Sequence, residues 1–72
     1  MGYNIYAEKN IERLKATLKN MGYVKDYPKS VFGVALMVTF GMGKERAIYW
    51  LSNFETVGKI KIIEGVVNFI EN

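Results

Sequence analysis

The sequence predicts an α+β domain in which three helices precede a C-terminal β-hairpin. Apolar residues recur every three or four positions in two stretches, one near the start of the chain and one after residue 43, and each stretch predicts a helix. An apolar segment between them, residues 31–41, predicts the remaining helix. Alternating lysine and isoleucine after residue 58 predicts the hairpin, residues 59–70. With 72 residues, the chain is expected to form one domain over 1–72.

Composition narrows the classes of function. Half of the residues are hydrophobic, which is typical of a chain that folds around a core. Cysteine and histidine are both absent, so disulfides, the usual zinc sites and nucleophiles that depend on an imidazole base are excluded. The carboxylates form no close pair suited to acid–base catalysis. We therefore expect no enzyme activity, no metal and no cofactor.

Charge and hydropathy bear on partners and location. The net charge of +3 permits a polyanionic partner without requiring one. The longest uncharged stretch, residues 30–43, is shorter than the roughly 20 apolar residues of a membrane span. No apolar signal core is evident near the N-terminus. We expect a soluble, cytoplasmic protein that does not engage a membrane.

The first helix is predicted by one apolar stripe, whose members are Ala7, Ile11, Leu14, Leu18 and Met21. Asn4 or Asn10 is expected to cap its start, and Gly22 to stop it in the left-handed conformation.

The second helix is predicted over "VFGVALMVTF", which is apolar on every side. Valine, phenylalanine and threonine also favour a strand. We prefer a helix because Ser30, after Pro28, is a good N-cap and Gly41 a good stop. A short strand near residues 23–24 is expected to pair with the hairpin.

The third helix begins after Gly43, ends at Gly58, and carries apolar residues at Ala47, Ile48, Trp50, Leu51, Phe54 and Val57. In the hairpin, Glu64-Gly65 supplies the tight turn. Ile60 and Ile62 are expected on one strand face and Lys59 and Lys61 on the other.

The residues around Gly41 resemble the helix-turn-helix of bacterial and phage regulators. Relative to this glycine, apolar or small residues stand at the positions where two such helices touch, namely Leu36, Phe40, Met42, Ala47 and Trp50. The segment "LSNFETVGKI" is similar to the "LxxLExxGLI" that leads into the wing of winged-helix domains. Met37 stands where that pattern usually has a small residue, which predicts that the two helices are splayed. The resemblance implies a winged helix-turn-helix with its third helix in the DNA major groove.

The residues expected to contact DNA lie on the third helix and the wing. Periodicity places Lys44, Glu45, Ile48, Tyr49 and Ser52 on the exposed helix face, with Asn53 nearby. Lysines are suited to phosphate contacts, and serine and asparagine to base edges or phosphates. The candidate DNA-binding residues are Lys44, Arg46, Tyr49, Ser52, Asn53, Lys59 and Lys61.

Two functions follow from this pattern. The first is a small regulator of transcription or replication that binds double-stranded DNA, and the second is a winged-helix module that binds a protein partner without binding DNA. Ile48 and Tyr49 on the reading face and Glu64 at the wing tip favour the second. A homodimer is expected because the chain is short and has neither a disulfide nor a metal site to stabilise its small core. Its expected interface is the first helix with the N-terminal segment "GYNIYAEKN", because Tyr3, Ile5 and Tyr6 exceed what so small a core can absorb.

Overall fold

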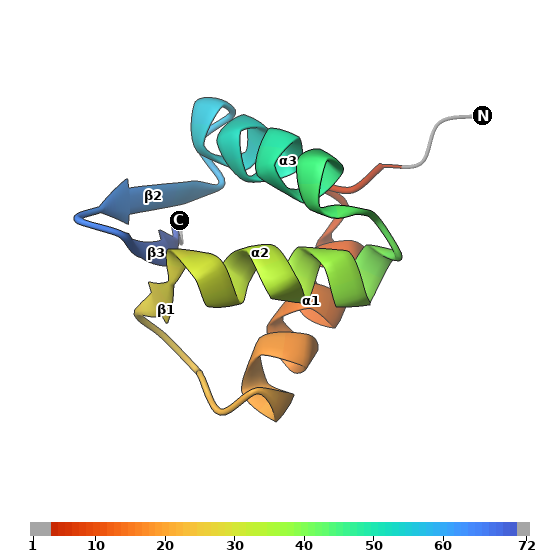
Figure 1. Ribbon diagram of the computed structural model, residues 1–72, viewed down its shortest axis with the longest axis horizontal. Helices are drawn as coiled ribbons and strands as arrows, with labels where there is room; N and C mark the ends of the chain where they lie inside the picture. Colours follow the sequence, from red (N-terminus) through yellow and green to blue (C-terminus); the bar gives the residue numbers. More distant parts are fainter. Residues whose placement is uncertain (1–3, 71–72) are drawn as a thin grey trace.

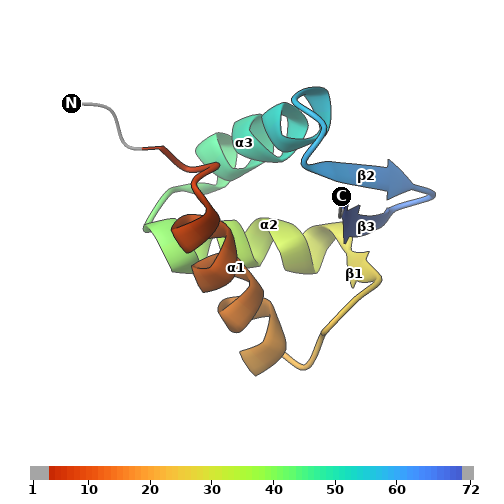
Figure 2. The same ribbon diagram turned by 180° about the vertical axis from the view of Figure 1, so that it is seen from behind.

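Three helices share one core, and a small antiparallel sheet closes one end of it (Figure 1). The computed structural model describes residues 4–70. The elements are, in order, α1 (Glu8–Asn20), β1 (Tyr27–Pro28), α2 (Lys29–Phe40), α3 (Lys44–Thr56), β2 (Ile60–Ile63) and β3 (Val66–Phe69). The helix α2 is central: α3 lies along one side of it, and α1 crosses it on another (Figure 2). This is the predicted three-helix arrangement with a hairpin wing after the third helix.

The sheet confirms the hairpin and its turn. The strand order is β1-β3-β2, and both pairs are antiparallel, with Ile60 opposite Phe69 and Ile63 opposite Val66. Both turn residues, Glu64 and Gly65, have positive φ, which two-residue hairpin turns of this kind require. As expected, Ile60 and Ile62 face the core while Lys61 faces outward.

The short pairing strand lies at Tyr27–Pro28, so its expected position at residues 23–24 is wrong. Burial explains the shift. The Tyr27 side chain is 4% exposed and packs on Phe69, whereas Val24 is 71% exposed. The strand entry is fixed by a reciprocal contact between Asp26 and Asn68, in which the Asp26 N–H donates to Asn68 Oδ1 at 2.8 Å and Asn68 Nδ2 donates to Asp26 Oδ1 at 2.9 Å.

The helix over the apolar segment is confirmed, but its predicted cap is wrong. The helix α2 begins at Lys29, with Pro28 at the cap position, and Ser30 already lies inside the helix. Because Pro28 belongs to β1, the extended chain passes directly into the helix, and the Lys29 N–H donates to the Gly65 carbonyl of the wing turn at 2.9 Å.

Neither asparagine caps α1, whose cap residue is Ala7. Asn10 is instead buried within the helix and uses its side-chain amide to donate to the Asn4 carbonyl at 2.6 Å. The predicted stops are confirmed at the other ends: Gly22, Gly41 and Gly58 have positive φ immediately after or at the end of their helices.

The core explains why α2 lacks a polar stripe. Phe32, in the first turn of α2, is fully buried and contacts the rings of Tyr27, Phe54 and Phe69. Because α2 packs against α1, α3 and the sheet, most of its circumference meets other elements. The remaining circumference stays apolar and open: Val34 is 46% exposed and Val38 is 66% exposed.

Two residues of the expected N-terminal dimer interface, Ile5 and Tyr6, pack against the core of their own chain. Ile5 is 2% exposed and belongs to the core, and the Tyr6 ring packs edge-on against Phe54 at 5.1 Å between centroids. The core absorbs these residues because α1 and α3 leave a space between them that the segment before α1 fills. Tyr3, the third residue of the expected interface, lies outside the described residues.

Two glycines of the same helix are expected to respond to alanine with opposite signs. Gly41 has φ 64°, so Gly41→Ala should destabilise the fold by about 1–2 kcal/mol through left-handed strain. Gly33 lies within α2, and a Cβ added there meets nothing within 4 Å. Gly33→Ala should therefore stabilise the fold by about 0.5–1 kcal/mol. Urea denaturation of both variants checks the pair, and a shift in the same direction for both would contradict this assignment of the turn.

Candidate nucleic-acid interface

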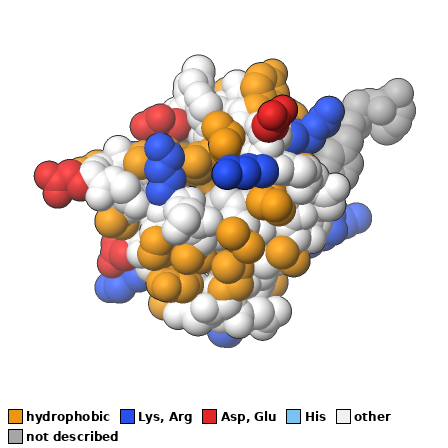
Figure 3. All heavy atoms as spheres, viewed as in Figure 1, with side chains coloured by type: hydrophobic (Ala, Val, Ile, Leu, Met, Phe, Trp, Pro, Cys, Tyr) orange, Lys and Arg blue, Asp and Glu red, His pale blue; other side chains and the backbone are white. Residues whose placement is uncertain are grey.

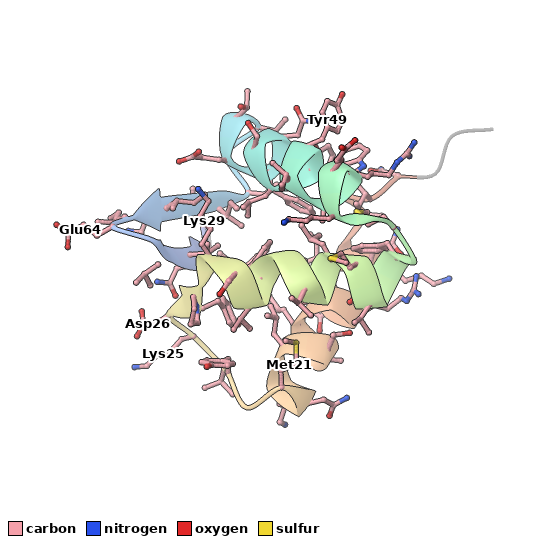
Figure 4. The ribbon with its side chains drawn as sticks, in the orientation of Figure 1. Met21, Lys25, Asp26, Lys29, Tyr49 and Glu64 are labelled. Atoms are coloured by element: carbon pink, nitrogen blue, oxygen red, sulfur yellow. The ribbon has the colours of Figure 1, made fainter. Side chains whose placement is uncertain are left out.

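The outer face of α3 is exposed to solvent, as the periodicity of its sequence predicts. Lys44, Glu45, Ile48, Tyr49 and Ser52 are all exposed. Tyr49, at 62% exposed, points away from the body of the domain (Figure 4). Asn53 differs from this group because it is half-buried on the flank of the helix.

The inner face of α3 is held firmly. Ala47, Leu51 and Phe54 are buried in the core. On one flank, Trp50 lies edge-on between Tyr6 and Tyr49, with centroid distances of 5.7 and 5.5 Å. Burial raises the pKa of the Tyr6 phenol, and the neighbouring Tyr49 adds a smaller increase in the same direction. The packing of its inner face thus fixes the direction in which the outer side chains of α3 point.

The structure does not bring the four predicted basic residues together. Lys44 and Arg46 both border a hollow at the start of α3, together with Glu45 and Tyr49, and Arg46 also borders a second hollow with Phe40 and Trp50. Neither hollow is lined by Lys59 or Lys61. Lys59 borders a hollow beside α1 together with Glu8 and Glu12. Lys61 lies on the outer face of the sheet, opposite Asn68. Of the four, Lys44 alone lines the space between α2 and α3.

Lys29 joins Lys44 in that space and was missed by sequence reasoning. It is exposed, and in Figure 4 it extends from the start of α2 toward α3 and the wing. The signal was present in the sequence, because a residue directly after a helix-initiating proline occupies the first turn. Assigning the cap to Ser30 placed Lys29 outside the helix and hid this signal.

Lys29 and Lys44 are each the first residue of a helix, and neither helix has a side-chain cap. The first N–H groups of a helix lack intrahelical partners and carry the positive end of the helix dipole. At α2, the Lys29 N–H is bound by the Gly65 carbonyl. The other N–H groups of the two first turns remain suited to an anion, with a lysine ammonium beside each.

An apolar groove of about 550 Å³ separates these two lysines. Besides Lys29, Lys44 and Ser30, its lining consists of Gly33, Val34, Met37, Ala47, Ile48 and Leu51. Figure 3 shows hydrophobic side chains gathered along α2 and between α2 and α3, with basic side chains beside them. Met37, which was expected to splay the helices, lines this groove, although the splay itself stays a prediction.

Acidic side chains limit the extent of positive charge on the surface around this groove. Glu45 is exposed on the outer face of α3, and Glu55 is exposed near its end. Glu64 occupies the tip of the wing (Figure 4). The basic character is therefore local to the two helix starts and does not extend over the whole face.

No family model, curated protein or solved structure matched the chain. None of the helices within residues 4–70 is long and apolar enough to cross a membrane.

Proposed function

We propose that the protein is a small regulator of transcription or replication that binds double-stranded DNA through its winged helix-turn-helix. The observation that carries this proposal is the pair of helix starts, each with a lysine, at the two ends of the space between α2 and α3. A cytoplasmic location, where such DNA would be met, is part of the proposal.

The exposed outer face of α3 and the two lysines at helix starts suit a DNA groove with its flanking phosphates. With α3 directed into that groove, Lys29 and Lys44 would meet phosphates and Tyr49 and Ser52 would reach base edges. Lys61, on the outer face of the wing, is a further candidate for a phosphate contact.

The second candidate function is a protein-interaction module that does not bind DNA. The apolar groove favours it, because Ile48 is 57% exposed where a reader of DNA usually presents polar groups. The carboxylate of Glu64 at the wing tip favours it as well, since it would repel a phosphate.

A homodimer stays part of the proposal, on the ground that the chain is short and lacks cysteine. We expect sedimentation at micromolar concentration to show a species of twice 8.2 kDa. A single species of 8.2 kDa under those conditions would contradict the dimer. The proposed DNA binding would then be that of a monomer.

Tyr49 offers a test of the reading face. Tyr49→Ala should weaken binding to a preferred duplex about tenfold, because a base-edge contact is worth about 1–3 kcal/mol. The dependence of affinity on salt should not change, since tyrosine is uncharged at neutral pH. Fluorescence anisotropy with a labelled duplex measures both quantities.

The matched control is Tyr49→Phe, which keeps the ring against Trp50 and removes only the hydroxyl. Equal affinity of wild type and Tyr49→Ala for every duplex in a randomised pool would show that this face does not read DNA.

A further inference from the structure

The groove between α2 and α3 carries more apolar surface than DNA can cover. Val34 and Ile48 border it at 46% and 57% exposed, and Val38, one turn further along α2, is 66% exposed. A DNA major groove offers apolar contact mainly through thymine methyl groups, and its backbone is charged. Such DNA could reach Ile48 on α3, but it gives Val34 and Val38 on α2 no apolar partner. A contiguous exposed patch of this kind typically marks a protein-binding surface.

The shape of the patch fits a helix. It follows α2 for two turns, from Ser30 to Val38, and is bordered on the other side by two turns of α3, from Lys44 to Leu51. An amphipathic helix presents apolar side chains at positions i, i+3, i+4 and i+7, and this stripe spans the same two turns.

The two lysines that line the groove indicate the charge of the partner. Lys29 and Lys44 are the charged residues among those that line the groove, and they stand at its opposite ends, because α2 starts at the wing and α3 ends there. A partner helix with acidic residues at both ends of its apolar stripe would pair with them. A second copy of this chain fits less well, since two grooves placed face to face around a twofold axis would set lysines of one copy against lysines of the other.

We propose that this groove binds an acidic amphipathic helix of a partner protein, and that the bound helix excludes DNA. Exclusion follows from shared residues, because Lys44 and Ile48 belong both to the groove and to the outer face of α3. The docking part stands independently of DNA, whereas the exclusion part rests on the DNA-binding function proposed above.

The test uses the full chain and a synthetic helical peptide of about 15 residues, long enough for four turns. Leucines occupy positions i, i+3, i+4 and i+7 of the peptide, with glutamates at both ends. A second peptide carries lysines in place of the glutamates. Anisotropy of the labelled peptides, measured without DNA, should give at least tenfold tighter binding of the acidic peptide. The unlabelled acidic peptide should then displace a labelled duplex from the wild-type protein.

Two surface variants locate the binding. Val34→Gln should weaken the acidic peptide at least tenfold, while Val24→Gln, at a 71% exposed valine in the loop before β1, should change it less than twofold. Circular dichroism establishes that both variants are folded. Equal binding of the two peptides, or no effect of Val34→Gln, would overturn the docking proposal. So would a wild-type dimer that Val34→Gln dissociates, because the occupant would then be a second copy. Peptide binding without any duplex binding would support the docking and overturn both the exclusion and the function proposed above.

Discussion

Phe32→Ala is expected to cost about 3–5 kcal/mol of folding free energy, the usual range for removing a fully buried phenylalanine. Phe32 is 0% exposed, and its ring lies 5.6 Å from that of Phe69 and 6.2 Å from that of Phe54. It therefore joins α2 to the sheet and to α3 at once. A domain of 72 residues has a total stability of only about 4–11 kcal/mol, so the loss would consume much or all of it.

Urea denaturation followed by circular dichroism measures this effect. Val38→Ala is the matched control, because it shortens a residue of the same helix that is 66% exposed, and it should cost less than about 0.5 kcal/mol. A Phe32→Ala protein with wild-type stability would mean that the core is not organised around this ring.

The double substitution Lys29→Ala plus Lys44→Ala is expected to have the largest effect on DNA binding. Each lost phosphate contact lowers the salt slope of the binding constant by about 0.9, so the slope should fall by about 1.8. Between 50 and 200 mM salt, the wild type should then lose roughly 12-fold more affinity than the variant. Titrations of one duplex at several salt concentrations measure this difference.

The control for net charge is Lys9→Ala plus Lys19→Ala, which removes two exposed lysines from α1. If the two double variants lower the salt slope equally, the contribution of Lys29 and Lys44 is one of overall charge and the helix starts have no special role.

Much of the fold could be predicted from local sequence. The three-four spacing on α1 and α3 and the alternation in "KIKII" each determine which face meets the core, and Gly41 sets the turn because it tolerates positive φ. The position of β1 could not be predicted in this way. Tyr27 pairs with Val67, forty residues away in the sequence, and this pairing depends on how the assembled sheet buries the tyrosine ring.

The site was only partly predictable for the same reason. Periodicity placed the exposed residues of α3 correctly, since they depend on one helix alone. Whether Lys44 lies near Lys59 depends on how three helices and a hairpin pack, and the packing directs Lys59 toward α1. Likewise, Lys29 and Lys44 border the same groove because α2 packs against α3, and the start of α2 is held by the wing turn through the bond from the Lys29 N–H to the Gly65 carbonyl.

The most direct test of the central claim, DNA binding through the winged helix-turn-helix, is a salt titration of the wild-type protein with duplex DNA of random sequence. The claim predicts a dissociation constant tighter than about 10⁻⁴ M and a logarithmic salt slope of about −1.8 to −2.7, for two or three phosphate contacts by Lys29, Lys44 and Lys61. Binding weaker than about 10⁻⁴ M, or an affinity that does not change with salt, would contradict it.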